Sequence, residues 1–105
     1  MVNIFNPKII GIDIDDKEKG KKLLRILRIL SCKGNYRLSS SKRGYHFRLK
    51  VNPHTKKENF NIRWMFGDCY GRLRGDFRRL KNDFLEFDVL FDVKNNKRSG
   101  KWKKI

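Results

Sequence analysis

The stretch that decides the fold is PKIIGIDID, residues 7–15. Isoleucine occupies every second position from Ile10 to Ile14, and the positions between and after them hold glycine or aspartate. This period of two is typical of a β-strand that buries one face. The pattern therefore predicts a strand with an apolar face and a polar face that carries Asp13 and Asp15.

A helix is expected directly after this strand, over residues 16–31. Leucine and isoleucine repeat there at helical spacing, and lysine and arginine fall between them. Asp15 or Asp16 is a natural N-cap, because an aspartate side chain accepts backbone N–H groups at a helix start. Gly34 is expected to end the helix as a C-terminal glycine.

The later elements follow from the same two periods. We expect strands over residues 36–39 and 45–51, a turn over 40–43, a helix over 56–66, and two extended segments over 72–78 and 87–94. The order β-α-β-β-α-β is that of an RRM-like, or ferredoxin-like, domain. The predicted fold class is thus a single small α+β domain over residues 1–94, with an antiparallel sheet and helices on one face. Residues 95–105 are expected to form an exposed basic tail.

Charge dominates the composition. The 105 residues hold 27 Lys and Arg against 11 Asp and Glu, a formal net charge of +16. Aromatic residues make up 12%, enough to build a small core and too many for a disordered basic tail. A field of this sign attracts polyanions, which include nucleic acid, nucleotides and an anionic membrane surface, and the charge alone does not decide between them.

The sequence also bears on membrane association and on the cellular compartment. Its apolar runs are shorter than the roughly 20 residues that cross a bilayer, and Met1 to Pro7 does not resemble a signal peptide. Cys32 and Cys69 are far apart and are read as plain thiols of a reducing compartment. We therefore expect an intracellular, cytoplasmic protein without a membrane partner. Because the core is small, a homodimer is possible but not required.

Acidic and basic side chains are predicted to share the open face of the sheet. Alternate residues of a strand lie about 7 Å apart on one face, so Asp13 and Asp15 can chelate a divalent cation together. Mg²⁺ or Mn²⁺ suits such oxygen ligands and keeps positions for phosphate oxygens. Asp76 on a neighbouring strand would complete a two-metal site for phosphoryl transfer. The plain alternatives are that the aspartates after residue 12 only cap the helix and that His46 is a surface histidine.

Three segments together resemble the archaeo-eukaryotic primase superfamily, in particular the short primase-polymerases of plasmids and viruses. They are IIGIDID (residues 9–15), SSSKRGYH (residues 39–46) and a later aspartate followed by arginine. The order of the motifs is kept over about residues 9–94. The sequence departs from the family at Lys42, where glycine is frequent, and it leaves no room for the additional N-terminal α/β module.

The resemblance implies a role for each matching residue. Asp13 and Asp15 match the motif that binds the catalytic metals, and Ser41, Arg43 and His46 match the motif that holds the phosphates of the incoming nucleotide. A hydroxyl, a guanidinium and an imidazole suit a triphosphate chemically. Gly44 would let the backbone approach those phosphates closely.

The third motif has three candidate acids. Asp76 is preferred because Arg78 follows it in phase on the predicted strand, while Asp68 and Asp92 remain alternatives. Four arginines of the same region are expected to contact the nucleic-acid backbone: Arg72, Arg74, Arg78 and Arg79.

Together with the resemblance, these residues predict a metal-dependent nucleotidyltransferase of the primase and DNA polymerase kind. The resemblance implies that it acts on a DNA template and primer with nucleoside triphosphates, in the replication of a small plasmid or viral genome, alone or with a partner replication protein. The alternative is a non-catalytic nucleic-acid-binding module on the same fold. Base-reading RRM sheets carry aromatics on their open face, whereas acids are predicted here, which favours the enzyme. A rolling-circle endonuclease is disfavoured because His46 lacks a second histidine at the required spacing.

Overall fold

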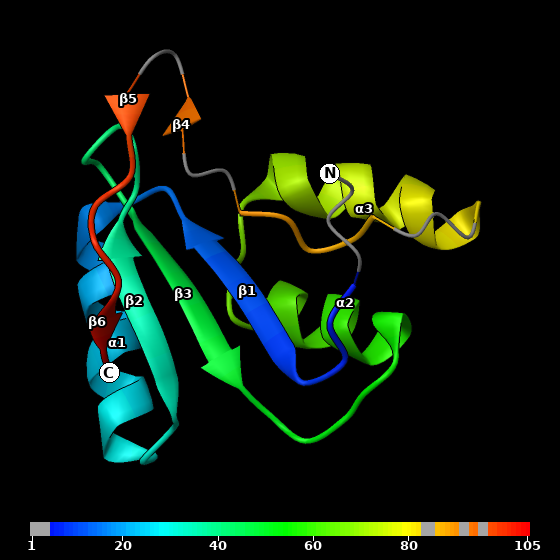
Figure 1. Cartoon of the computed structure of the whole chain (residues 1–105), viewed down its shortest axis with the longest axis horizontal. Coiled ribbons are helices and arrows are strands. Elements are labelled where there is room, and N and C mark those ends of the chain that lie inside the picture. Colours follow the sequence, from blue (N-terminus) through cyan, green and yellow to red (C-terminus); the bar gives the residue numbers. More distant parts are fainter. Residues whose placement is uncertain (1–4, 83–85, 91–92, 95–96) are drawn as a thin grey trace.

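The computed structural model describes residues 5–82, 86–90, 93–94 and 97–105. Its elements are β1 (Ile9–Ile14), α1 (Lys17–Ile29), β2 (Gly34–Leu38), β3 (Tyr45–Lys50), α2 (Lys56–Met65), α3 (Tyr70–Lys81), β4 (Val93–Lys94), β5 (Lys97–Arg98) and β6 (Lys103–Lys104). β1, β3, β2 and β6 form one antiparallel sheet in that order, and β4 pairs with β5 (Figure 1). The prediction of a small α+β domain of the ferredoxin-like kind is confirmed.

The core lies on the face of the sheet that the alternating isoleucines form. Ile10, Ile12 and Ile14 are at most 4% exposed, and they pack with Phe47 and Leu49 of β3 and with the leucines of α1. Ile62 of α2 joins the same cluster. α1 and α2 therefore cover one face, as expected, and the side chains between the isoleucines are directed to the other face.

Side chains cap the starts of α1 and α2, but Gly34 does not end α1. Asp16 caps α1 by accepting the backbone N–H of Lys19 at 3.0 Å, and Thr55 and Glu58 form a capping box at α2. The expectation for Gly34 is wrong, because α1 has already ended at Leu30 and Gly34 is the first residue of β2. Its φ of +151° and the overlap that a Cβ would make with the Arg48 carbonyl oxygen require glycine there.

The extended segment predicted over residues 72–78 is wrong, because these residues belong to helix α3. Glycines at 71 and 75 weaken the helical signal, since glycine disfavours helix interiors. The helix is stabilised by ion pairs at helical spacing, Asp68 with Arg72 and Asp76 with Arg79. α3 packs against α2 and extends beyond β1 (Figure 1), instead of adding a strand to the sheet.

The segment predicted as extended over residues 87–94 contributes the short strand β4, which pairs with β5 outside the main sheet. Residues 91–92 lie outside the described part of the chain.

The end of the chain is not a free tail. β6 pairs with β2, so that Lys103 lies opposite Tyr36 and Lys104 opposite Asn35. The Gly100 N–H donates to the Leu38 carbonyl at 2.9 Å, and the Ile105 N–H donates to the Gly34 carbonyl at 3.1 Å. Residues 100–105 thus complete the sheet. Within the described residues, the model contains no helix that combines the length and the apolar character needed to span a bilayer.

A candidate nucleotide site on the open face of the sheet

A cleft of about 680 Å³ lies between the end of β1, the β2–β3 turn and α3. The two N-terminal motifs contribute Asp13, Asp15, Ser41, Arg43 and His46 to its lining. Helix α3 contributes Arg72, Asp76 and Arg79. Eight of the ten residues predicted for the site are therefore brought together in one depression, although they come from three separate segments.

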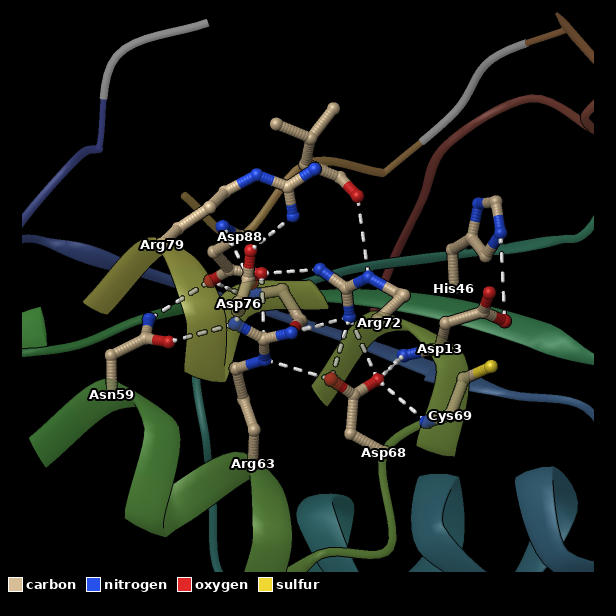
Figure 2. A network of polar contacts seen from close by, with 12 residues as sticks. Asp13, His46, Asn59, Arg63, Asp68, Cys69, Arg72, Asp76, Arg79 and Asp88 are labelled. Atoms are coloured by element: carbon tan, nitrogen blue, oxygen red, sulfur yellow. Dashed lines mark hydrogen bonds and ion pairs between the residues drawn. The ribbon is translucent and has the colours of Figure 1, made fainter. Parts of the chain in front are cut away.

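Asp13 and His46 lie side by side on neighbouring strands. They are paired in the register of β1 and β3, and His46 Nε2 is 3.6 Å from Asp13 Oδ1. The two aspartates differ in burial, since Asp13 is half-buried and Asp15, one residue past the end of β1, is exposed. Figure 2 shows the Asp13 carboxylate directed toward His46 and away from the helices that cover the core.

Asp13, Asp15 and Cys69 each bring one ligand atom to a group in which these atoms lie within 4.8 Å of one another. Burial, together with a hydrogen bond to Asp15, raises the pKa of the Cys69 thiol. Sulfur is a soft ligand, and Mg²⁺ and Mn²⁺ prefer oxygen ligands. The two carboxylates remain, and they fit Mg²⁺ or Mn²⁺, which are bound through one or two carboxylates with water and phosphate oxygens in the other positions. The sequence did not predict that Cys69 lies beside Asp13 and Asp15, because Cys69 is far from both of them along the chain.

His46 is held as a neutral imidazole. Arg37 Nε donates to His46 Nδ1 at 3.0 Å, and both side chains are buried. The pKa of His46 is lowered to about 4, mainly by burial and then by the positive charges of Arg37 and Arg72, against the opposing effect of Asp15. A histidine in this state offers the cleft one hydrogen-bond donor and no net charge.

The lowered pKa of His46 predicts acid sensitivity. As pH falls through 6.5, His46 takes up a proton in the unfolded chain before the folded chain does, so the free energy of unfolding decreases until pH reaches about 4. We expect a loss on the order of 3 kcal/mol from this group. Urea unfolding of the wild type and of His46→Asn between pH 7 and 4 measures it. An equally steep fall in both proteins would assign the loss to other groups.

The turn between β2 and β3 adds hydroxyl groups and a guanidinium to the lining of the cleft. Ser39 and Ser41 hydroxyls lie 3.1 Å apart, and the Arg43 N–H donates to Ser41 Oγ at 3.3 Å. Ser41 and Arg43 are exposed at the cleft, so they can contact a ligand. Glycine is required at position 44 by packing, because a Cβ there would overlap the carbonyl oxygen of Ile14 where β3 begins beside β1. The expected approach of this backbone to phosphates stays a prediction.

Asp76 lines the cleft from helix α3 and not from a strand, so the reason for preferring it is wrong. Its carboxylate accepts from Arg63 Nη1 at 2.6 Å, from Arg79 Nη1 at 2.9 Å and from the Asp88 N–H at 3.0 Å. It is also outside the group of ligand atoms formed by Asp13, Asp15 and Cys69. These contacts leave Asp76 poorly placed to bind a metal.

Asp68 and Asp92 are the other two candidates for the third acid. The Asp68 carboxylate is completely buried and accepts from Arg63, from Arg72 and from the Asp13 and Cys69 N–H groups. Asp92 lies outside the described residues.

These ion pairs belong to a buried network that runs along the outer edge of β1 (Figure 2). Asp88 accepts the Gly11 N–H at 2.7 Å, and Asp68 accepts the Asp13 N–H at 2.6 Å. The carbonyl groups of the same two residues are acceptors: Arg72 donates to the Gly11 carbonyl at 3.2 Å, and the Cys69 N–H donates to the Asp13 carbonyl at 2.8 Å. Side chains and one loop N–H thus satisfy the backbone groups that a further strand would otherwise pair with.

The four arginines predicted to contact nucleic acid lie in three different environments. The Arg72 side chain is 11% exposed and is engaged by Asp68 and Asp88, so it supports β1 and leaves little surface for a phosphate. Arg79 is 41% exposed at the cleft. Arg74 and Arg78 are exposed on α3 but do not line the cleft.

Comparison of the chain with protein-family models, with curated proteins and with solved structures finds no match. The functional argument therefore stands on the geometry of the cleft and on the chemistry of its side chains.

Proposed function

We propose that this protein is a metal-dependent nucleotidyltransferase that binds a nucleoside triphosphate in the cleft at the end of β1. One observation carries the proposal: two adjacent carboxylates of the kind that hold Mg²⁺ line the same cleft as a hydroxyl, a guanidinium and a neutral imidazole. Carboxylates on a surface that grips phosphate would repel it unless a cation lay between them. More specifically, we propose a primase or DNA polymerase activity in plasmid or viral replication.

Each side chain has a distinct part in the proposed binding. Asp13 and Asp15 would hold the divalent cation, which when bound neutralises phosphate charge and favours in-line displacement. Arg43 and Ser41 would donate to phosphate oxygens from the turn, with Arg43 adding a charge-assisted hydrogen bond. His46 would donate from Nε2. Arg79 at the cleft and the high net charge of +16 would attract the template backbone.

Calorimetric titration tests the binding step. We expect Mn²⁺ and a nucleoside triphosphate to bind together to the wild type, and to lose this mutual dependence in Asp13→Asn/Asp15→Asn. Arg43→Ala should weaken triphosphate binding roughly ten-fold while leaving Mn²⁺ binding in place, because one charge-assisted contact is lost.

Asp16→Asn is the matched control. It removes an adjacent exposed acid, and asparagine caps a helix as well as aspartate does. Triphosphate binding that is indifferent to Mn²⁺ and to both aspartates would contradict the proposal.

A non-catalytic nucleic-acid-binding module is the second candidate. It is favoured by the engagement of Asp68 and Asp76 in ion pairs, since Asp13 and Asp15 are then the two carboxylates in the group of ligand atoms found among the described residues. Tight, salt-dependent binding of single-stranded DNA without metal-dependent triphosphate binding would support it. Such an outcome would replace the enzyme proposal.

A further inference from the structure

One row of side chains crosses the open face of the sheet and takes one residue from each of four chain segments. Asp13 of β1 lies opposite His46 of β3, and His46 lies opposite Arg37 of β2. Trp102 immediately precedes Lys103, which pairs with Tyr36, so it continues the row beside Arg37. The row therefore connects the end of the chain with the cleft.

The contacts along this row are continuous. The Arg37 guanidinium lies 4.2 Å from the centre of the Trp102 ring. Arg37 Nε donates to His46 Nδ1 at 3.0 Å, and His46 Nε2 is 3.6 Å from Asp13 Oδ1. Arg37 is 5% exposed, so its guanidinium has few alternative positions once it lies against the indole.

The direction of the Arg37 hydrogen bond decides which ring nitrogen of His46 carries the proton. A guanidinium has only donors and does not lose its charge in proteins. His46 Nδ1 must therefore act as an acceptor, and in a neutral imidazole the proton is then on Nε2. Nε2 is the nitrogen directed to Asp13 and the cleft (Figure 2).

We infer that Arg37 is a positioning residue that fixes His46 as the Nε2–H tautomer, and that Trp102 holds Arg37 in the required place. The C-terminal segment thereby becomes part of the site: a strand far from the motifs in sequence sets the hydrogen-bonding character of the cleft histidine. The consequence for phosphate binding rests on the proposed function, whereas the assignment of the tautomer does not.

Ring ¹⁵N chemical shifts of His46, measured by NMR at neutral pH without ligand, test the assignment. In the wild type we expect Nε2 to be protonated and Nδ1 to show the shift of an acceptor. Arg37→Met should mix the two tautomers. Arg37→Lys retains a donor and the charge but loses the planar group. Its population of the Nε2–H tautomer should lie between those of the wild type and of Arg37→Met. Trp102→Leu should mix the tautomers in part while leaving Arg37 in the chain.

Arg48→Ala is the matched control. The Arg48 guanidinium also lies over Trp102, at 4.8 Å from the ring centre, but Arg48 is exposed and acts on His46 as a minor positive charge, whereas Arg37 is hydrogen-bonded to it. The control should leave the His46 shifts unchanged. A wild-type His46 protonated on Nδ1, or an unaltered Nε2–H tautomer in Arg37→Met and Trp102→Leu, would overturn the inference. If Arg37→Met does not fold, Arg37→Lys and Trp102→Leu decide.

A second readout separates the two proposals. With Mn²⁺ present, Arg37→Met should weaken triphosphate binding roughly ten-fold, and Arg48→Ala less than about two-fold. A wild type that has the Nε2–H tautomer but binds no triphosphate would reject the proposed function and keep the positioning role. A wild type that binds triphosphate with His46 in the other tautomer would do the reverse.

Discussion

Primer extension by Asp13→Asn/Asp15→Asn should fall by roughly a thousand-fold or more relative to the wild type. A catalytic metal ion supplies several kcal/mol of transition-state stabilisation, and each 1.4 kcal/mol is a factor of ten in rate. The two amides are close in size to the carboxylates but cannot neutralise a divalent cation. Extension of a labelled primer on a single-stranded template, with Mg²⁺ or Mn²⁺ and nucleoside triphosphates, measures the effect.

Affinity for single-stranded DNA should be unchanged or raised in the same variant. The double substitution removes two negative charges from the protein surface, and this reduces the repulsion of a polyanion. Fluorescence anisotropy without divalent ions measures this affinity, and Asp16→Asn again controls for the loss of an acid next to the site. A double variant that still extends primers would place the catalytic centre elsewhere in the chain.

Replacing Arg63 with methionine should lower the free energy of unfolding by about 3–5 kcal/mol, the usual cost of removing one partner from a buried ion pair. The Arg63 side chain is completely buried and donates to Asp68 at 2.7 Å and to Asp76 at 2.6 Å. Methionine fills much of the space but leaves both carboxylates less compensated. Urea unfolding followed by circular dichroism measures the loss.

Two further variants separate charge from packing. Arg78→Met removes an exposed arginine of α3 and should change stability by no more than about 0.5 kcal/mol. Arg63→Met/Asp76→Asn should be more stable than Arg63→Met alone, because one uncompensated carboxylate is gone. If the second substitution only adds to the loss, the ion pair is not what Arg63 contributes.

The first half of the fold could be predicted from local patterns. The alternation of isoleucines in β1, the polar and apolar sides of β3 and the caps at Asp16 and Thr55 depend on residues close in the sequence, so the periods report them directly. Asp13 and His46 were expected on the polar side of their strands, and they are indeed neighbours on that face of the sheet. α3 was not predictable in this way, because its arginines and acids alternate like a strand while their ion pairs form at helical spacing.

The third acid of the site could not be chosen from the sequence. Whether Asp68 or Asp76 meets a ligand or an arginine depends on Arg63, which approaches both from α2 only after the chain has folded. The roles of Arg37 and Trp102 were hidden for a similar reason. Their contact requires residues 103–104 to pair with β2, and a stretch with so many lysines resembles a solvated end.

The polar network beside β1 also limits how this protein can associate with itself. A sheet edge with available N–H and C=O groups is a template on which a neighbouring molecule can add a strand and begin to aggregate. Here the Gly11 and Asp13 edge is already occupied by carboxylates and a guanidinium, so an incoming strand would have to displace buried ion pairs. Growth of the sheet into a dimer is therefore directed to the opposite border, at β6, where two consecutive lysines repel a like-charged copy. The same residues that support the aspartates of the cleft thus help to keep a small, sheet-containing protein dispersed in solution.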